Sequence, residues 1–331
     1  MTAPWRCPRC RGALSDAGTS LHCAACSVSY DVVDGIPDLR VPTPAWIDFE
    51  RDKAEARRLA ALGSASAEAL ARDVFQSRPH WSDARVQFRT RQVMEGPARA
   101  RREIETWLAP AARASGALLE IGCGTGGLLA ALPADREAAG IDVSLAWLVV
   151  AKRLLAEHGR TPPLAAAVAE ALPLADASAG AIVALDVIEH VADLRPVLRE
   201  IDRVAAPDAA LAFATPNRYS LGAEPHVGVW GVGWLPRRLQ SPYVTWRTGE
   251  PYTFARLLSA REALRLVRAN TRFDARADAP PIPDEEIAQF GARRAALARA
   301  YNRLSGMPGM RRVFVSIGPF FHLTGRRIPD R

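Results

Sequence analysis

The sequence predicts an α/β protein with a parallel sheet, preceded by a small metal-binding domain and a helical segment. Three observations support this: four cysteines in the first 26 residues, a short apolar run that ends in a glycine-rich loop, and a second apolar run that ends at Asp142. A length of 331 residues suggests about two domains. We expect the small domain over residues 1–40, a helical cap or lid over 41–110, and the α/β domain over 111–331.

The composition is that of a folded, soluble protein. Hydrophobic residues make up 49% of the chain and charged residues 24%, which excludes a disordered chain. No apolar run reaches the length that a membrane-spanning helix needs, and the first residues lack the pattern of a secretory signal. We therefore expect a cytoplasmic protein.

The positive charge is concentrated at the carboxyl end. The net charge is +7, whereas residues 287–331 alone carry nine arginines against Asp330. The rest of the chain is then close to neutral, so a diffuse nucleic-acid-binding surface is not indicated and we expect no nucleic-acid partner.

Four cysteines form two CxxC pairs near the amino end: Cys7, Cys10, Cys23 and Cys26. Four thiolates presented by two tight turns suit a tetrahedral zinc ion, and a site filled by four protein ligands leaves no position for water. We expect a structural Zn²⁺ here. Disulfides are the alternative, which a reducing cytosol disfavours. Residues 1–40 resemble the Trm112-like zinc ribbon, in which the metal would contribute to the folding free energy.

The segment from residue 41 to 110 has helical character. Arg51–Leu62 and Pro97–Leu108 show the apolar spacing of amphipathic helices. A cap that packs on the α/β domain is the first interpretation. A lid that closes over the ligands is the second.

The strongest functional signal is the segment that begins at Ala117. An apolar run over 117–121 predicts a buried parallel strand, the glycines of 122–127 let a ligand approach the backbone, and a helix follows. Glu120 stands at the end of the first strand, where a carboxylate would repel a pyrophosphate but can accept a hydrogen bond from an amine. Asp142 ends the second strand, where it can bind both hydroxyls of a ribose.

These motifs and those that follow resemble the class I S-adenosylmethionine-dependent methyltransferases over about residues 118–217. The resemblance implies a Rossmann-like seven-stranded sheet with helices on both faces, and S-adenosylmethionine as the cofactor. The cofactor residues that it implies are Glu120, Gly122, Cys123, Gly124, Thr125, Gly126, Asp142, Val143, Ala169, Glu170 and Asp186. Two departures from the family pattern are Val168, where an acid is common, and the turn at residues 207–209.

Candidate groups for the methyl acceptor follow the fourth and fifth strands of the resemblance. Glu189 and His190 follow the fourth strand, and His226 lies in a glycine- and tryptophan-rich loop over about 216–250. We expect catalytic roles for these three residues, with a histidine as general base, and we expect the loop to form a substrate wall. The alternatives are a structural hydrogen bond of His190, a divalent ion held by Asp186, Glu189 and His190, and a loop fixed by buried tryptophans.

The carboxyl-terminal segment, residues 311–327, is apolar and flanked by arginines. We favour the last, antiparallel strand of the sheet. A peripheral membrane contact near a lipid-linked acceptor is the second interpretation.

The sequence thus indicates methyl transfer to an oxygen of a small molecule, such as a secondary metabolite, a sugar or a lipid-linked acceptor. A ribosomal RNA guanine methyltransferase is one alternative. A methyltransferase-fold protein that docks a partner without catalysis is another.

Overall fold

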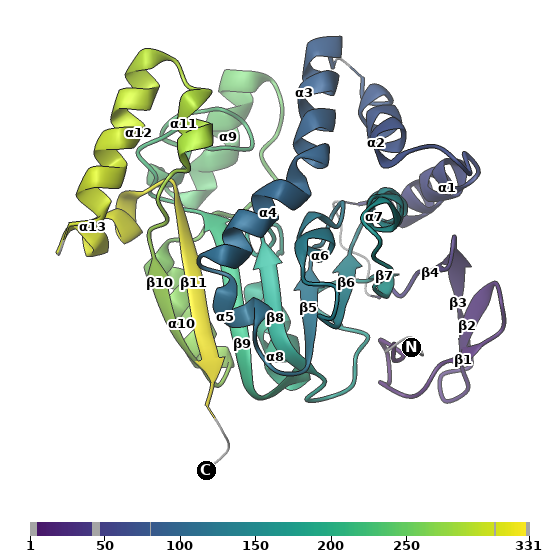
Figure 1. The fold of residues 1–331 in the computed structure, drawn as a ribbon. Coiled ribbons are helices and arrows are strands. Elements are labelled where there is room, and N and C mark those ends of the chain that lie inside the picture. The colour runs from purple at the N-terminus through teal and green to yellow at the C-terminus, as the bar shows by residue number, and fades with distance from the viewer. Residues whose placement is uncertain (1–4, 42–46, 80, 308, 329–331) are drawn as a thin grey trace. The chain divides into compact units, whose positions relative to one another are not determined.

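The computed structural model describes residues 5–41, 47–79, 81–307 and 309–328 (Figure 1). The chain divides into two compact units. Unit 1 comprises Met1–Ala184, Arg195–Leu211 and Arg327–Arg331, and unit 2 comprises Leu185–Leu194 and Ala212–Arg326. Within the described residues, no helix is both long enough and apolar enough to cross a membrane.

Unit 1 begins with a small antiparallel sheet that carries the four cysteines. Its strands are β1 (Ser15–Asp16), β2 (Ser20–Cys23), β3 (Val28–Val33) and β4 (Ile36–Pro37), in that order. The hairpin of β2 and β3 is in register from Ser20↔Asp31 to Cys23↔Val28, which brings the second cysteine pair to its turn. The predicted small domain in front of the α/β fold is confirmed.

This small sheet is joined to the edge of the large sheet by backbone bonds. The amide of Leu39 donates to the carbonyl of Ala166 at 2.7 Å, and the amide of Arg6 donates to that of Pro173 at 2.8 Å. The residues that follow β4 therefore continue the large sheet at its β7 edge, where Asp38 and Ala166 form a parallel bridge.

Helices fill most of the next segment, as the sequence predicts. They are α1 (Phe49–Ala60), α2 (Ala67–Gln76), α3 (Asp83–Met94), α4 (Gly96–Glu105) and α5 (Ala109–Ala112). The side chains of Asp48, Ser66 and Ser82 cap the first three helices by accepting from backbone amides. Helices α1 and α2 pack against α7 (Leu145–Glu157), and α4 packs against α6 (Gly127–Ala131), as a cap would. Residues 42–46 and 80 of this segment lie outside the described residues.

The large sheet has seven strands in the order β10-β11-β9-β8-β5-β6-β7. The strands are β5 (Ala117–Ile121), β6 (Ala138–Asp142), β7 (Leu164–Ala166), β8 (Ala179–Leu185), β9 (Ala205–Pro216), β10 (Phe273–Asp278) and β11 (Phe320–Arg327). Strand β5 pairs in parallel with β6 and β8, and β6 with β7. Their nearly continuous apolar sequences are buried, as expected for a parallel sheet covered by helices. The predicted α/β class with a Rossmann-like seven-stranded sheet is confirmed.

Unit 2 adds the remaining helices around β10 and β11. They are η1 (Val232–Trp234), α9 (Arg237–Thr248), α10 (Ala260–Asn270), α11 (Asp284–Ala288), α12 (Ala292–Ser305) and α13 (Met310–Ile317). One small core gathers Val229, Val232, Val244 and Tyr252. It fixes the segment that follows β9, which the sequence identified only as a loop.

Helix α8 (Leu194–Val204) leads directly into β9 at Ala205. One boundary differs from the sequence prediction. The prediction of a single strand over residues 311–327 was partly wrong. Residues 310–317 form α13, and the strand is Phe320–Arg327. The apolar residues at 310, 313, 314 and 317 have helical spacing, and Gly318 and Pro319 end the helix.

Candidate cofactor and acceptor sites

The glycine-rich loop of unit 1 turns sharply after β5. Gly122, Gly124 and Gly126 have φ angles of 70°, 51° and 76°, a region that side chains disfavour. The amides of Gly122 and Cys123 both donate to the carbonyl of Ile141, at 2.8 and 2.9 Å, so the loop folds onto the end of β6. A Cβ built on Gly124 would meet no atom within 4 Å, which leaves open space beside the loop backbone.

Asp142 holds this loop in place from the end of β6. One carboxylate oxygen accepts from the Gly124 amide and the other from the Ser144 amide, both at 2.8 Å. Burial raises the pKa of Asp142, and the two amide bonds act in the opposite direction. The carboxylate therefore stands where the sequence predicted a ribose-binding acid, and it also links the glycine loop to α7.

Glu120 is the buried acid of the site. Only 4% of the residue is exposed, and its Oε2 has no hydrogen-bond partner among the described residues. Burial raises the pKa of Glu120 well above its usual value, and the charge of Asp142 raises it further. Buried polar atoms are rarely left without a partner, so an unpartnered carboxylate oxygen beside an open loop fits a ligand amine. The carboxylates of Glu120 and Asp142, together with the loop backbone, thus provide hydrogen-bonding groups that fit S-adenosylmethionine.

Arg40 and Asp52 contact the turn that contains Val143, and the sequence analysis did not identify either residue. The buried Arg40 guanidinium donates to Asp38 at 2.6 and 2.7 Å, to Asp52 at 2.6 Å and to the carbonyl of Val143 at 3.0 Å. Asp52, on α1, also accepts from the hydroxyl of Ser144 at 2.7 Å and from the first amide of α7 at 2.8 Å. The exit of the small sheet and the cap helix therefore both position the turn that contains Val143.

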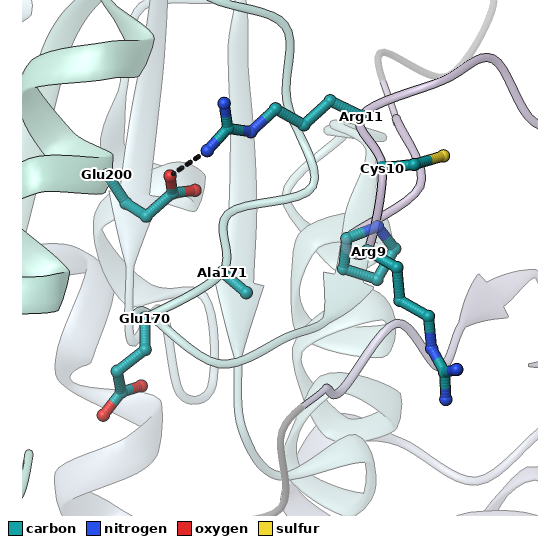
Figure 2. Close-up of a pocket in the computed structure, with 7 residues that line it drawn as sticks. Arg9, Cys10, Arg11, Glu170, Ala171 and Glu200 are labelled. Atoms are coloured by element: carbon teal, nitrogen blue, oxygen red, sulfur yellow. Dashed lines mark hydrogen bonds and ion pairs between the residues drawn. The ribbon is translucent and has the colours of Figure 1, made fainter. Parts of the chain in front are cut away.

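The remaining predicted cofactor residues of unit 1 lie in the segment after β7. Ala169 is buried, and Glu170 is half-buried. Glu170 borders a cavity of about 270 Å³, shown in Figure 2, where Arg11 forms an ion pair with Glu200 at 3.3 Å. The other lining residues are Pro8, Arg9, Cys10 and Ala171. Residues 8–11, which precede the small sheet, therefore border the segment that contains the predicted cofactor residue Glu170.

The four cysteines of the small sheet converge, as the spacing predicts. All four sulfur atoms lie within 4.8 Å of one another, with Cys7–Cys26 at 3.9 Å and Cys10–Cys23 at 3.5 Å. A tetrahedral zinc ion at about 2.3 Å from each sulfur requires sulfur–sulfur distances of about 3.8 Å. All four are free thiols, so the disulfide alternative is not supported. The donor set fits a structural zinc ion.

In unit 2, Glu189, His190 and His226 come together, and we call them the Glu189 cluster. One oxygen or nitrogen atom from each lies within 4.8 Å of the others. The ring centroids of His190 and His226 are 4.9 Å apart. The sequence predicted all three as catalytic residues without showing that they meet.

Hydrogen bonds fix the orientation of both imidazoles. His190 Nδ1 lies 2.8 Å from the carbonyl oxygen of Phe254, and His226 Nδ1 lies 2.5 Å from Glu224 Oε1. Because both partners are acceptors, each Nδ1 carries the proton, and in the neutral ring each Nε2 keeps its lone pair. Tyr252 fixes Glu224 in turn by donating to the same Oε1 at 3.2 Å.

Glu189 is fully buried beneath the two imidazoles. Its Oε2 accepts from the Thr215 hydroxyl at 2.9 Å, whereas Oε1 has no hydrogen-bond partner among the described residues. Burial, with the charge of Asp186, raises the pKa of Glu189 to about 7. Burial also lowers the pKa of His190. Burial acts the same way on His226, but its bond to Glu224 prevails and the pKa of His226 is raised.

Asp186, the predicted cofactor residue of unit 2, directly follows β8. It is an exposed residue with a φ of 53°, and its amide donates to the carbonyl of Ala214 at 2.9 Å. Such left-handed backbone is uncommon outside glycine and marks a position worth attention in a site. The register of β8 places Ala184, two residues earlier, beside Ile121 of β5.

The tryptophans of the segment after β9 are exposed. Trp230 is 64% exposed and Trp234 48%, and their indole N–H groups donate to the carbonyls of Leu221 and Ser220. The alternative of a loop fixed by buried tryptophans was therefore wrong. The aromatic faces stay available to a ligand, while their polar edges are held by the backbone.

Some residues that shape the cluster were not identified from the sequence. Phe254 and Tyr252 lie far along the chain from His190, and they act through a carbonyl group and a buried hydroxyl. Neither has a motif. Only the acid at Glu224, two residues before His226, was a local signal of the pairing.

Part of the chain matches a known protein family. Residues 119–213 match a family model described as a methyltransferase domain, and this span contains Glu120, Asp142 and Glu189. Among solved structures, the chain is similar to the YcgJ protein of Bacillus subtilis, with 19% identity, a TM-score of 0.45, and coverage of 69% of this chain and 99% of that one. It is also similar to Haemonchus contortus phosphoethanolamine N-methyltransferase 2 in complex with phosphomonomethylethanolamine and S-adenosylhomocysteine. The identity is 16%, the TM-score is 0.48, and the match covers 80% of this chain and 61% of that one. A third similar structure is a complex of the Haloferax volcanii Trm112 methyltransferase activator and a methyltransferase. The identity is 17%, the TM-score is 0.45, and the match covers 73% of this chain and 96% of that one.

Proposed function

We propose that this chain, which carries a methyltransferase domain over residues 119–213, transfers the methyl group of S-adenosylmethionine to an oxygen atom of a small molecule. We assign Glu120, Asp142 and the glycine-rich loop to the cofactor, and the Glu189 cluster to the acceptor. The cofactor provides a methyl group already activated by a positive sulfur, so the protein mainly has to align donor and acceptor and exclude water.

The observation that carries the choice of oxygen is the Glu189 cluster. A hydroxyl is a poor nucleophile until its proton is removed, and a neutral imidazole nitrogen fixed in direction can take that proton. His226 offers such a nitrogen, because Glu224 orients the ring through Nδ1. When bound, the cofactor would supply the methyl group, and its sulfur would keep the electron pair of the carbon–sulfur bond. His226 Nε2 would take the proton of the acceptor hydroxyl as the hydroxyl oxygen bonds to the methyl carbon.

The exposed tryptophans support a small organic acceptor. Trp230 and Trp234 present apolar faces next to their anchored N–H groups, and such faces stack on sugar or aromatic rings. We assign the segment after β9 as the substrate wall on this basis.

We assign the four cysteines to a structural zinc ion. Residues 1–40 are few for a self-supporting core, so metal binding would supply part of their folding free energy. Through Leu39 and Arg40, the same sheet supports the edge strand and the Val143 turn. The zinc site would thus stabilise the cofactor site at a distance.

The test is methyl transfer from labelled S-adenosylmethionine into host extracts that are fractionated into RNA, protein, lipid and small molecules. We expect the label in a small-molecule or lipid fraction, as an alkali-stable ether or an ester. Label in RNA would refute the proposal, and so would label in protein.

Histidine variants test the roles of the cluster. We expect His226→Ala to lower turnover at least about 100-fold, the lower range for a general base. His158→Ala is the control, because His158 ends α7 in unit 1 and its ring bonds to the Leu154 carbonyl. Full turnover of His226→Ala would show that the proton acceptor is another group.

A further inference from the structure

We propose that the Glu189 cluster is a binding site for a divalent first-row transition-metal ion, with Glu189 Oε1, His190 Nε2 and His226 Nε2 as its three ligands. The site itself stands on geometry alone, and its role in catalysis rests on the proposed function.

The three side chains offer the right atoms in the right state. Each histidine has its Nδ1 occupied by an acceptor, the Phe254 carbonyl or the Glu224 carboxylate, so each Nε2 lone pair is left for a ligand. Metal-binding histidines almost always donate their other nitrogen to a carbonyl or carboxylate in this way. The hydrogen bonds of this cluster therefore match those of a metal site on both rings.

The buried carboxylate is the independent observation. Glu189 is fully buried, its Oε2 is held by Thr215, and Oε1 has no hydrogen-bond partner among the described residues. An unpartnered oxygen of this kind is costly unless a ligand compensates it. A cation among Glu189, His190 and His226 would pair with that oxygen.

The distances allow one ion to reach all three atoms. They lie within 4.8 Å of one another, so a point between them is at most about 2.8 Å from each atom, compared with about 2.1 Å in a bound site. Side-chain shifts of less than an ångström would close the site. The carboxylate of Glu224, 2.5 Å from His226 Nδ1, adds negative charge that favours a cation.

The ligand set indicates the class of ion. Two imidazoles and one carboxylate suit Mn²⁺, Fe²⁺, Co²⁺ or Zn²⁺ better than Mg²⁺ or Ca²⁺, which prefer oxygen ligands. Three protein ligands also leave coordination positions for the oxygens of an acceptor. With the ion bound, the acceptor hydroxyl would coordinate the metal and lose its proton to solvent water, so that His226 is a ligand and not the base.

Mn²⁺ is the probe, because the thiolates of the four-cysteine site prefer softer ions. Binding to the whole protein, purified with its zinc, is followed by electron paramagnetic resonance of the free ion. We expect one Mn²⁺ per chain. His190→Ala, His226→Ala and Glu189→Gln should weaken binding at least 10-fold. Glu224→Gln should weaken it about 10–100-fold, because it removes the negative charge that makes the His226 ring a stronger ligand.

His158→Ala is the control variant and should bind Mn²⁺ like the unmodified protein. Circular dichroism confirms that each variant is folded. Absence of Mn²⁺ binding by the unmodified protein, or equal binding by the folded His190→Ala and His226→Ala variants, would overturn the metal site.

Methyl transfer separates this inference from the proposed function. Turnover that needs added Mn²⁺ supports the metal site and methyl transfer to oxygen, and it makes His226 a metal ligand in place of the base. Turnover without any Mn²⁺ binding removes the metal site and leaves His226 as the base. Mn²⁺ binding that depends on the cluster, in a protein that methylates no oxygen, keeps the metal site and refutes the proposed function.

Discussion

Replacement of Arg40 by alanine tests whether the small sheet supports the cofactor site. The Arg40 side chain has no exposed surface, and its two acidic partners, Asp38 and Asp52, are only 9% and 11% exposed. Removing one member of a buried ion pair costs about 3–5 kcal/mol, because the partner charge stays buried without compensation. Lys53 lies 3.5 Å from Asp38 and compensates part of that charge, so we expect the lower end, about 3 kcal/mol.

That loss corresponds to a decrease in Tm of about 6–12 °C, at 2–4 °C per kcal/mol for a domain of this size. Differential scanning calorimetry measures it. Arg57→Ala is the control: Arg57 is 59% exposed, its partner Asp31 is 48% exposed, and such a pair contributes about 0–1 kcal/mol. We also expect weaker binding of S-adenosylmethionine to Arg40→Ala, because the carbonyl of Val143 and the start of α7 lose their support. Equal Tm values for the two variants would refute the reasoning.

Three further predictions concern unit 1. Asp142→Ala should abolish calorimetric binding of S-adenosylmethionine, because the side chain also holds the Gly124 amide; unchanged affinity would exclude Asp142 from the site. Gly140→Ala should lower the free energy of unfolding by about 1–3 kcal/mol, because its Cβ would lie 2.6 Å from a Leu129 methyl group. Urea titration measures this loss. Gly306→Ala is the control and should have little effect, because its Cβ would make only ordinary van der Waals contacts. Cys10→Ser should reduce bound zinc from one ion per chain to less than one in native mass spectrometry and lower Tm; full zinc content would show that Cys10 is not a ligand.

The glycine-rich loop and the position of Asp142 could be predicted because their signals are local. The strand, the glycine turn and the following helix are continuous in sequence, and Asp142 ends the next strand along the chain. In a parallel sheet, consecutive strand ends meet at one edge, so the position in sequence already places these groups together. The cysteine pairs were predictable for the same reason, since spacing within each turn fixes where the sulfurs point.

The support of that site was not predictable. Arg40 and the Val143 carbonyl that it binds are 103 positions apart, and both acids around it are ordinary surface types in the sequence. Only the packing of α1 on α7 brings Asp52 to the start of α7. The carboxyl-terminal helix α13 shows a related limit. Its short apolar run is compatible with both a strand and a helix, and the structure shows that it is a helix that ends at Gly318.

The sequence by itself determined the fold class, the glycine-rich loop after β5 and the convergence of the four cysteines, because each depends on neighbours within one or two elements. Tertiary structure alone decided that Glu189, His190 and His226 form one cluster, that Glu224 and Phe254 orient its rings, and that Trp230 and Trp234 are exposed. Those features depend on how the segment after β9 folds back. No period or motif encodes that path, because it is set by the packing of a small core and by buried hydrogen bonds between residues distant in sequence.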